Sequence, residues 1–289
     1  MITRRRLLEA AAVVPAIRAL PAAGSQKQLK AIGVQLYTIR DVIAKGDAAA
    51  ALKSLDQIGY REAEVVWASL DQVWPGLRKT RMRPVGIHMD SALFQPQNKA
   101  KLSAAIDTVK QHGFQYVVYP ALPDSERTGG ADRFKALADT LNEAGAQCHR
   151  LGMEMCYHNH AFDFRPIGST TGLEILMTQA DKQLVGFELD IFWASVAGHE
   201  PAELLKSHPG RFPLMHLKNK PPGMAVQFNE TVPDNAFLEV GRGSLDIAAI
   251  LRAAEDSGVK HFFVEQDRTP GNPVDSLKQS YEYLSKLKF

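Results

Sequence analysis

The stretch Cys156-Tyr157-His158-Asn159-His160-Ala161-Phe162-Asp163-Phe164 follows an apolar run that begins at Met153. Alternate side chains of an extended strand face the same way, so we expect His158 and His160 to project together where a strand ends. Two imidazoles there indicate a metal site or a proton-transfer site. A His-x-His pair is also common among hydrogen-bonded structural histidines, so a metal site requires further ligands.

Further candidate ligands follow three later apolar runs. These runs are Gly186-Phe187-Glu188-Leu189-Asp190, Leu214-Met215-His216-Leu217-Lys218 and Phe262-Phe263-Val264-Glu265-Gln266-Asp267. Each is a short strand-like segment that ends in a carboxylate or an imidazole. Four strands with ligands at their C-terminal ends predict the active site of a barrel.

The rest of the chain supports a barrel by its alternation of strand and helix patterns. Strands are predicted at residues 31–37, 62–66, 84–88, 116–119, 153–157, 185–189, 213–217 and 261–264, with a helix after each. One helix is expected to open at Arg40-Asp41 and continue to Ile58, and another to cover 245–256 with Ser244 as its N-cap. Eight such units over about 260 residues predict a single α/β domain, a (β/α)8 TIM barrel. A doubly wound sheet would place a Gly-rich turn after the first strand, and residues 37–45 have none.

The composition and net charge of the chain indicate which classes of binding partner to expect. The chain has 289 residues, 45% of them hydrophobic, and a formal charge of +2, which is enough apolar sequence for one large core. Without a dense Lys/Arg stripe, nucleic acid is not an expected partner. The two cysteines, Cys148 and Cys156, are expected to be free buried thiols rather than a disulfide.

The N-terminus has the features of an export signal. Thr3-Arg4-Arg5-Arg6-Leu7-Leu8 precedes an Ala-rich apolar stretch and then Pro21-Ala22-Ala23-Gly24. We predict a twin-arginine-type signal peptide over residues 1–26, a mature barrel over 27–289 and a periplasmic location. The apolar stretch is too short and too Ala-rich to predict a stable membrane span. The alternative is an amphipathic helix on a cytoplasmic protein.

Strand register selects the residues expected at the shared pocket. They are Gln35, Tyr37, Glu62, Glu64, His88, Asp90, His158, His160, Glu188, Asp190, His216, Lys218, Glu265 and Asp267. Nitrogen and oxygen ligands without a thiolate suit Mn²⁺, Mg²⁺, Co²⁺ or Zn²⁺ equally well. Simpler roles stay open: His88 also fits a rim hydrogen bond, and Glu62 or Glu188 fits a buried salt bridge. Gly241-Arg242-Gly243 fits a turn better than a phosphate site.

Several short motifs, in order along the mature chain, resemble one known family. They are Gln35-Leu36-Tyr37, Gly59-Tyr60 with Glu64, Gly86-Ile87-His88, Tyr157-His158-Asn159-His160, Glu188-Leu189-Asp190 with Trp193, His216-Leu217-Lys218, Gly241-Arg242-Gly243 and Glu265-Gln266-Asp267. Together they resemble the xylose-isomerase-like TIM-barrel family of sugar phosphate isomerases and epimerases, in its Tyr-His-Asn-His subgroup. Relatives in that family also include inosose and dehydroshikimate dehydratases and the DNA-repair enzyme endonuclease IV.

The resemblance implies one divalent ion held by a Glu, an Asp, a His and a second Glu. The Asp, the His and the second Glu correspond to Asp190, His216 and Glu265 in this sequence. The position of the first Glu carries no carboxylate here, and His158 is the expected replacement ligand. His160 and Glu265 are then the expected acid and base. The residues expected to bind substrate are Glu64, His88, Lys218, Tyr37 and Trp193.

The implied activity is that of a sugar isomerase or epimerase acting on a sugar-derived keto compound through an enediolate. The alternative is a metal-dependent lyase that dehydrates an inosose or eliminates from a 3-keto-glycoside. A metal-free sugar-binding barrel also stays open, because fold does not determine function. The expected partner is a small carbohydrate, with homo-oligomerisation left open. The segment 219–240, which is longer than a plain connection, is predicted to cover the pocket.

Overall fold

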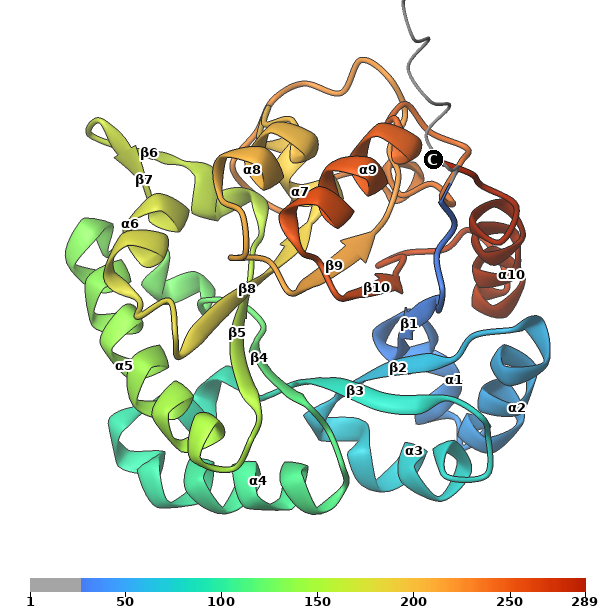
Figure 1. The fold of residues 1–289 in the computed structure, drawn as a ribbon, viewed down its shortest axis with the longest axis horizontal. Helices are drawn as coiled ribbons and strands as arrows, with labels where there is room; N and C mark the ends of the chain where they lie inside the picture. The colour runs from blue at the N-terminus through green and yellow to red at the C-terminus, as the bar shows by residue number, and fades with distance from the viewer. Residues whose placement is uncertain (1–26) are drawn as a thin grey trace, which may run out of the picture.

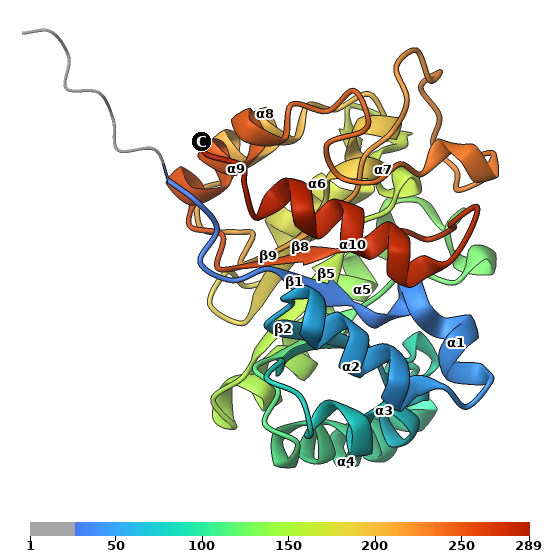
Figure 2. The same cartoon turned by 90° about the vertical axis from the view of Figure 1, so that its right-hand side faces the viewer.

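The computed structural model describes residues 27–289, and the predicted signal peptide lies outside them. Eight parallel strands close into a barrel in the order β1-β10-β9-β8-β5-β4-β3-β2, with helices around the outside (Figures 1 and 2). The barrel strands are β1 Gly33–Gln35, β2 Glu62–Val66, β3 Arg83–His88, β4 Tyr116–Tyr119, β5 Glu154–His158, β8 Val185–Asp190, β9 Leu214–Leu217 and β10 His261–Val264. The predicted TIM barrel is confirmed.

The helices cover the outer face of the barrel. They are α1 Arg40–Ala44, α2 Ala48–Ile58, α3 Leu70–Leu77, α4 Lys99–Gln111, α5 Gly130–Arg150, α6 Gly172–Gln179, α7 Ile191–Val196, α8 Pro201–Ser207, α9 Ile247–Ser257 and α10 Pro273–Leu284. A small hairpin, β6 Pro166–Ile167 with β7 Thr170–Thr171, stands apart from the barrel. None of the helices described is long and apolar enough to cross a membrane.

Two predicted helix boundaries were wrong. The first helix is two, α1 and α2, because the chain turns at Gly46 with φ 90° before Asp47 starts α2. Helix α9 is capped by Asp246 rather than Ser244: the Asp246 carboxylate accepts a hydrogen bond of 3.0 Å from the Ala249 amide. The hydroxyl of Ser244 instead donates to the Lys220 carbonyl. Both cysteines are free and buried, as predicted.

The alternation of side chains along each strand separates the core into two parts. Outward residues such as Met155 and Tyr157 of β5 pack in the main core with the helices. Inward residues fill the barrel with a second, smaller cluster of buried side chains, formed by Val85, Tyr116, Val118, Cys156, Leu214 and Phe263. Because Cys156 faces inward, His158 two residues later does so too and lies above this cluster.

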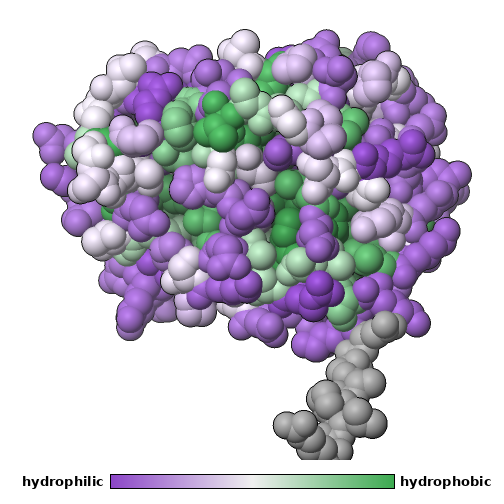
Figure 3. Space-filling model, turned by 90° about the horizontal axis from the view of Figure 1, so that it is seen from above, coloured by the Kyte–Doolittle hydropathy of each residue, from purple (hydrophilic) through white to green (hydrophobic). Residues whose placement is uncertain are grey.

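The surface is mostly hydrophilic where Figure 3 shows it, with apolar residues gathered in smaller patches near the middle. Within residues 27–289, the large hydrophobic side chains that are exposed are Tyr37, Val226 and Tyr283. Single exposed apolar residues of this kind are normal for a folded protein.

Candidate active site at the C-terminal end of the barrel

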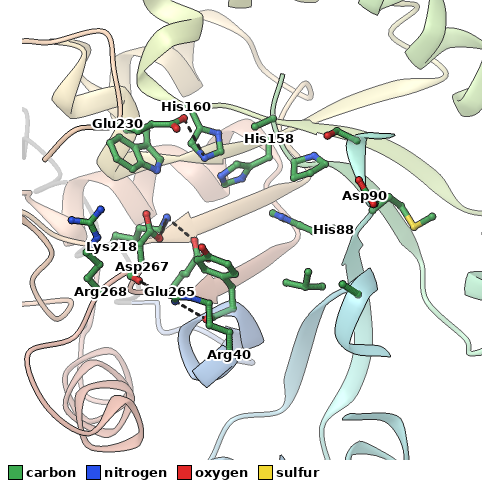
Figure 4. A pocket seen from close by; sticks show the side chains of 18 of the residues that line it. Arg40, His88, Asp90, His158, His160, Lys218, Glu230, Glu265, Asp267 and Arg268 are labelled. Atoms are coloured by element: carbon green, nitrogen blue, oxygen red, sulfur yellow. Dashed lines mark hydrogen bonds and ion pairs between the residues drawn. The ribbon is translucent and has the colours of Figure 1, made fainter. Parts of the chain in front are cut away.

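A pocket of about 590 Å³ opens at the C-terminal ends of the strands (Figure 4). Its lining includes most of the predicted site residues, namely Tyr37, His88, His158, His160, Trp193, Lys218 and Glu265. Asp190 and His216 are completely buried just below its floor. Parallel strands of a barrel all end at one rim, and this brings residues from distant parts of the chain together.

Imidazoles converge on one carboxylate at the floor. Three imidazole nitrogens lie near Glu188 Oε2: His88 Nε2 at 2.8 Å, His158 Nδ1 at 2.9 Å and His216 Nε2 at 3.2 Å. A carboxylate oxygen has two lone pairs, so it cannot accept hydrogen bonds from all three in good geometry. Meanwhile Glu188 Oε1 is buried without a hydrogen-bond partner among the described residues.

Glu64 lies one layer deeper than the sequence predicted. It does not line the pocket; its Oε2 accepts hydrogen bonds from Gln35 at 2.8 Å and from His216 at 2.6 Å. Its other oxygen lies against Gly86, where an added Cβ would come within 2.3 Å of it. Glu64 therefore supports the histidines from below, and Gly86 leaves room for it.

Two overlapping sets of residues have the spacing of metal ligands. His88, His158, Glu188 and His216 form one set, and Asp190, His216 and Glu265 form the other. Within each set the ligand atoms lie within 4.8 Å of one another. Three of the four predicted ligands thus form one set, and the fourth, His158, lies 3.8 Å from Asp190 Oδ2 and belongs to the other.

Lys218 neutralises part of the negative charge. Its ammonium contacts three carboxylates: Asp190 at 2.7 Å, Glu265 at 2.6 Å and Asp267 at 2.7 Å. Burial would lower the pKa of Lys218, but Asp190 and Asp267 outweigh it and hold that pKa well above its ordinary value. Buried carboxylates in excess of their cationic partners favour binding of a cation.

The histidines differ in their protonation. Burial would lower the pKa of His88, but the carboxylates of Glu64 and Glu188 raise it to about 9. Burial holds the pKa of His160 well below its ordinary value, and neighbouring His158 and Lys218 lower it further. His160 is therefore neutral at pH 7. Its ring Nδ1 has no hydrogen-bond partner among the described residues, and its backbone amide donates to the Asp163 carboxylate at 2.8 Å.

The segment 219–240 forms part of the pocket wall and contributes Glu230 and Phe237 to it. Hydrogen bonds connect it to the barrel, including the Gln227 amide to the Val196 carbonyl at 3.1 Å and Gln266 to the Phe237 carbonyl at 3.2 Å. Sequence reasoning did not identify Glu230, because it lies in a loop without a periodic pattern.

Comparisons with known proteins agree with this architecture. The family model for the xylose isomerase-like TIM barrel matches residues 47–287. The inosose dehydratase of Clostridium perfringens is 24% identical over 185 residues, 61% of this chain and 62% of that protein. The chain therefore spans about three fifths of the length of the curated relatives it matches.

The solved structures that share the fold include the two described next. A sugar phosphate isomerase/epimerase from Parabacteroides distasonis superposes with a TM-score of 0.73 at 22% identity, covering 94% of this chain and 98% of that one. The IOLI protein, crystallised with a zinc atom, gives a TM-score of 0.67 at 16% identity and covers 88% and 96%. At these sequence identities, the structural similarity establishes a shared fold only.

Proposed function

Because this chain belongs to the xylose isomerase-like TIM barrel family, we propose that it is a metal-dependent isomerase or epimerase of a sugar-derived keto compound. The observation that carries the proposal is the buried cluster of carboxylates and imidazoles at the floor of the pocket. The second candidate is a metal-dependent lyase of the dehydratase type, and the likeness to inosose dehydratases favours it.

The proposed metal ligands are His158, Asp190, His216 and Glu265. Their nitrogen and oxygen donors fit Mn²⁺, Mg²⁺, Co²⁺ or Zn²⁺. A divalent ion bound there would stabilise the negative charge that develops on a substrate oxygen. If it takes oxygens of Asp190 and Glu265, Lys218 still has Asp267 as a partner at 2.7 Å.

The chain's own residues would move the proton and hold the substrate. Neutral His160 is the proposed base, because it faces the pocket and its pKa is held low by burial. In Figure 4, Glu265 lies across the pocket from His160, and it is the proposed second acid–base group. His88, Lys218, Tyr37 and Trp193 line the pocket between and around them and would contact substrate hydroxyls.

The proposal is tested by NMR of candidate keto compounds in D₂O with metal-loaded protein. Scyllo-inosose and methyl 3-keto-β-D-glucoside are suitable probes. Exchange of the carbon-bound hydrogen next to the carbonyl supports the shared proton abstraction, and the product then separates isomerisation from dehydration or elimination. If neither compound exchanges or changes, with metal content confirmed, the proposed function is wrong.

We also propose export through the twin-arginine signal over residues 1–26, on sequence grounds alone. Replacing Arg4 and Arg5 by lysine should trap the protein in the cytoplasm, because that pathway reads the arginine pair. Cell fractionation measures the outcome, and an unchanged periplasmic yield would exclude this route.

A further inference from the structure

Unpaired polar atoms gather on the pocket wall near the 219–240 segment, apart from the metal-ligand sets. Trp193 Nε1, His160 Nδ1 and Glu230 Oε1 are each buried with no hydrogen-bond partner among residues 27–289. All three residues line the pocket, and the rings of His160 and Trp193 lie 5.7 Å apart. Buried polar atoms normally have partners, so an unpaired donor and an unpaired acceptor beside a cavity indicate ligand contacts.

Glu230 has one oxygen occupied and one free. Its Oε2 accepts a hydrogen bond of 2.9 Å from Arg127. Its Oε1 lies 3.8 Å from His160 Nε2 (Figure 4), which is longer than the roughly 2.7–3.2 Å of a hydrogen bond. One additional oxygen atom could bond to both groups, since two bonds of about 2.8 Å span such a gap.

Arg127 fixes Glu230 before any ligand binds. The guanidinium of Arg127 stacks on the Phe162 ring at 4.1 Å, and its Nε donates to the Leu122 carbonyl at 2.8 Å. It also pairs with Asp124 at 2.8 Å. A side chain that is already ordered loses little entropy when it binds, so the carboxylate of Glu230 is preorganised as an acceptor.

We propose that Glu230 and Trp193 form a recognition subsite for a hydroxyl-bearing, non-reacting part of the substrate. The inference deepens the proposed function and rests on it. Hydroxyls both donate and accept, so one ligand can donate a hydroxyl proton to Glu230 Oε1 and accept the indole N–H of Trp193 at a hydroxyl oxygen. A phosphate monoester is mostly the dianion at neutral pH, so it rarely donates a hydrogen bond, and its charge would face the carboxylate of Glu230. The subsite therefore selects a neutral polyol over a phosphate ester at this position.

The test compares the binding of non-reacting polyols by three variants. Glu230→Gln removes the charged acceptor, and Trp193→Phe removes the donor but keeps an aromatic ring. Glu239→Gln is the matched control, since it makes the same charge change in the same segment but does not line the pocket. The probes are methyl β-D-glucopyranoside and myo-inositol, each with its monodeoxy derivatives, and glucose 6-phosphate. Calorimetry gives Kd, and circular dichroism confirms that each variant folds.

We expect Glu230→Gln to weaken polyol binding about ten- to a hundredfold, the scale for losing a hydrogen bond to a charged group. Trp193→Phe should weaken it by a smaller factor, and Glu239→Gln should not change it. One monodeoxy derivative should bind the wild type more weakly than its parent polyol does. Glu230→Gln should not weaken the binding of that derivative further. Glucose 6-phosphate should bind less tightly than the neutral glucoside.

Several results would overturn the subsite. They are no polyol binding by the wild type, equal binding by Glu230→Gln and Glu239→Gln, or tighter binding of the phosphate. A fourth is hydrogen exchange in D₂O slowed a hundredfold in Glu230→Gln at unchanged Kd, which would make Glu230 an acid–base group instead. Polyol binding that depends on Glu230 without any exchange would uphold the subsite and refute the proposed enzyme. Exchange in D₂O together with polyol binding that does not depend on Glu230 would uphold the proposed enzyme and refute the subsite.

Discussion

Replacing Lys218 by methionine should destabilise the metal-free protein strongly. Methionine keeps the length and flexibility of the side chain but removes the ammonium. The Lys218 side chain is 2% exposed, and its ammonium contacts three carboxylates within 2.7 Å. Breaking a buried pair leaves uncompensated charge and costs about 3–5 kcal/mol. We therefore expect a loss of that size in the free energy of unfolding.

Lys206→Met is the matched control. Lys206 pairs with Glu203 at 2.7 Å, the same distance, but its side chain is 60% exposed. Exposed pairs contribute at most about 1 kcal/mol. The difference between the two variants therefore measures what the buried, three-carboxylate environment of Lys218 adds to a single exposed pair at the same distance.

The assay is urea unfolding of chelator-treated protein at pH 7.5, repeated with Mn²⁺ or Zn²⁺. An ion at a hundred times its Kd should restore about 2.7 kcal/mol to Lys218→Met, because the carboxylates left behind include proposed ligands. If Lys218→Met costs no more than Lys206→Met, the charge-neutralising role of Lys218 is refuted. If Lys218→Met loses the expected stability but added metal restores none of it, the charge-neutralising role of Lys218 is supported and metal binding at these carboxylates is refuted.

Four further outcomes follow from the same geometry. Asp190→Ala or His216→Ala should lose stoichiometric metal, measured by elemental analysis, with an unchanged circular dichroism spectrum; full metal retention would contradict the ligand assignment. His160→Gln should keep its metal and slow exchange in D₂O about a hundredfold, the usual scale for an acid–base group, and near-normal exchange would refute that role. Burial raises the pKa of Asp163 to about 7, so the folded state holds a proton that the unfolded chain releases above pH 4; stability should fall between about pH 4 and 7, by at most about 4 kcal/mol. Asp163→Asn should lack that fall in thermal unfolding, and identical pH profiles would contradict it. Shortening residues 219–240 should change KM or specificity more than Tm, and equal kinetics would argue against a covering segment.

Strand period and barrel geometry were sufficient to predict most of the pocket. His158, Lys218 and Glu265 line it because side chains two apart share a face and all parallel strands end at one rim. The same rule misplaced Glu62, which shares a face with Glu64 but lies nearer the start of its strand. It pairs with Arg83 at 2.5 Å and His261 at 2.9 Å, a salt-bridge role that the sequence had left open.

What the sequence could not supply is the pairing between distant loops. Arg127 and Glu230 lie in irregular segments more than a hundred residues apart, and neither segment has a period that predicts a partner. The convergence of three imidazoles on Glu188 likewise depends on barrel closure, which sets distances between strands that no local pattern encodes.

Closure of the barrel also has a consequence for the order of assembly. β1 pairs directly with β10, with Gly33 beside Phe263, so the first and last strands of the chain complete the barrel together. Glu265, a proposed metal ligand, directly follows β10, and the ribosome makes it after every other proposed ligand. A chain synthesised only as far as β9 therefore lacks both the closed wall and the full ligand set. Capture of the ion at the proposed site would therefore report that the last strand has joined the barrel.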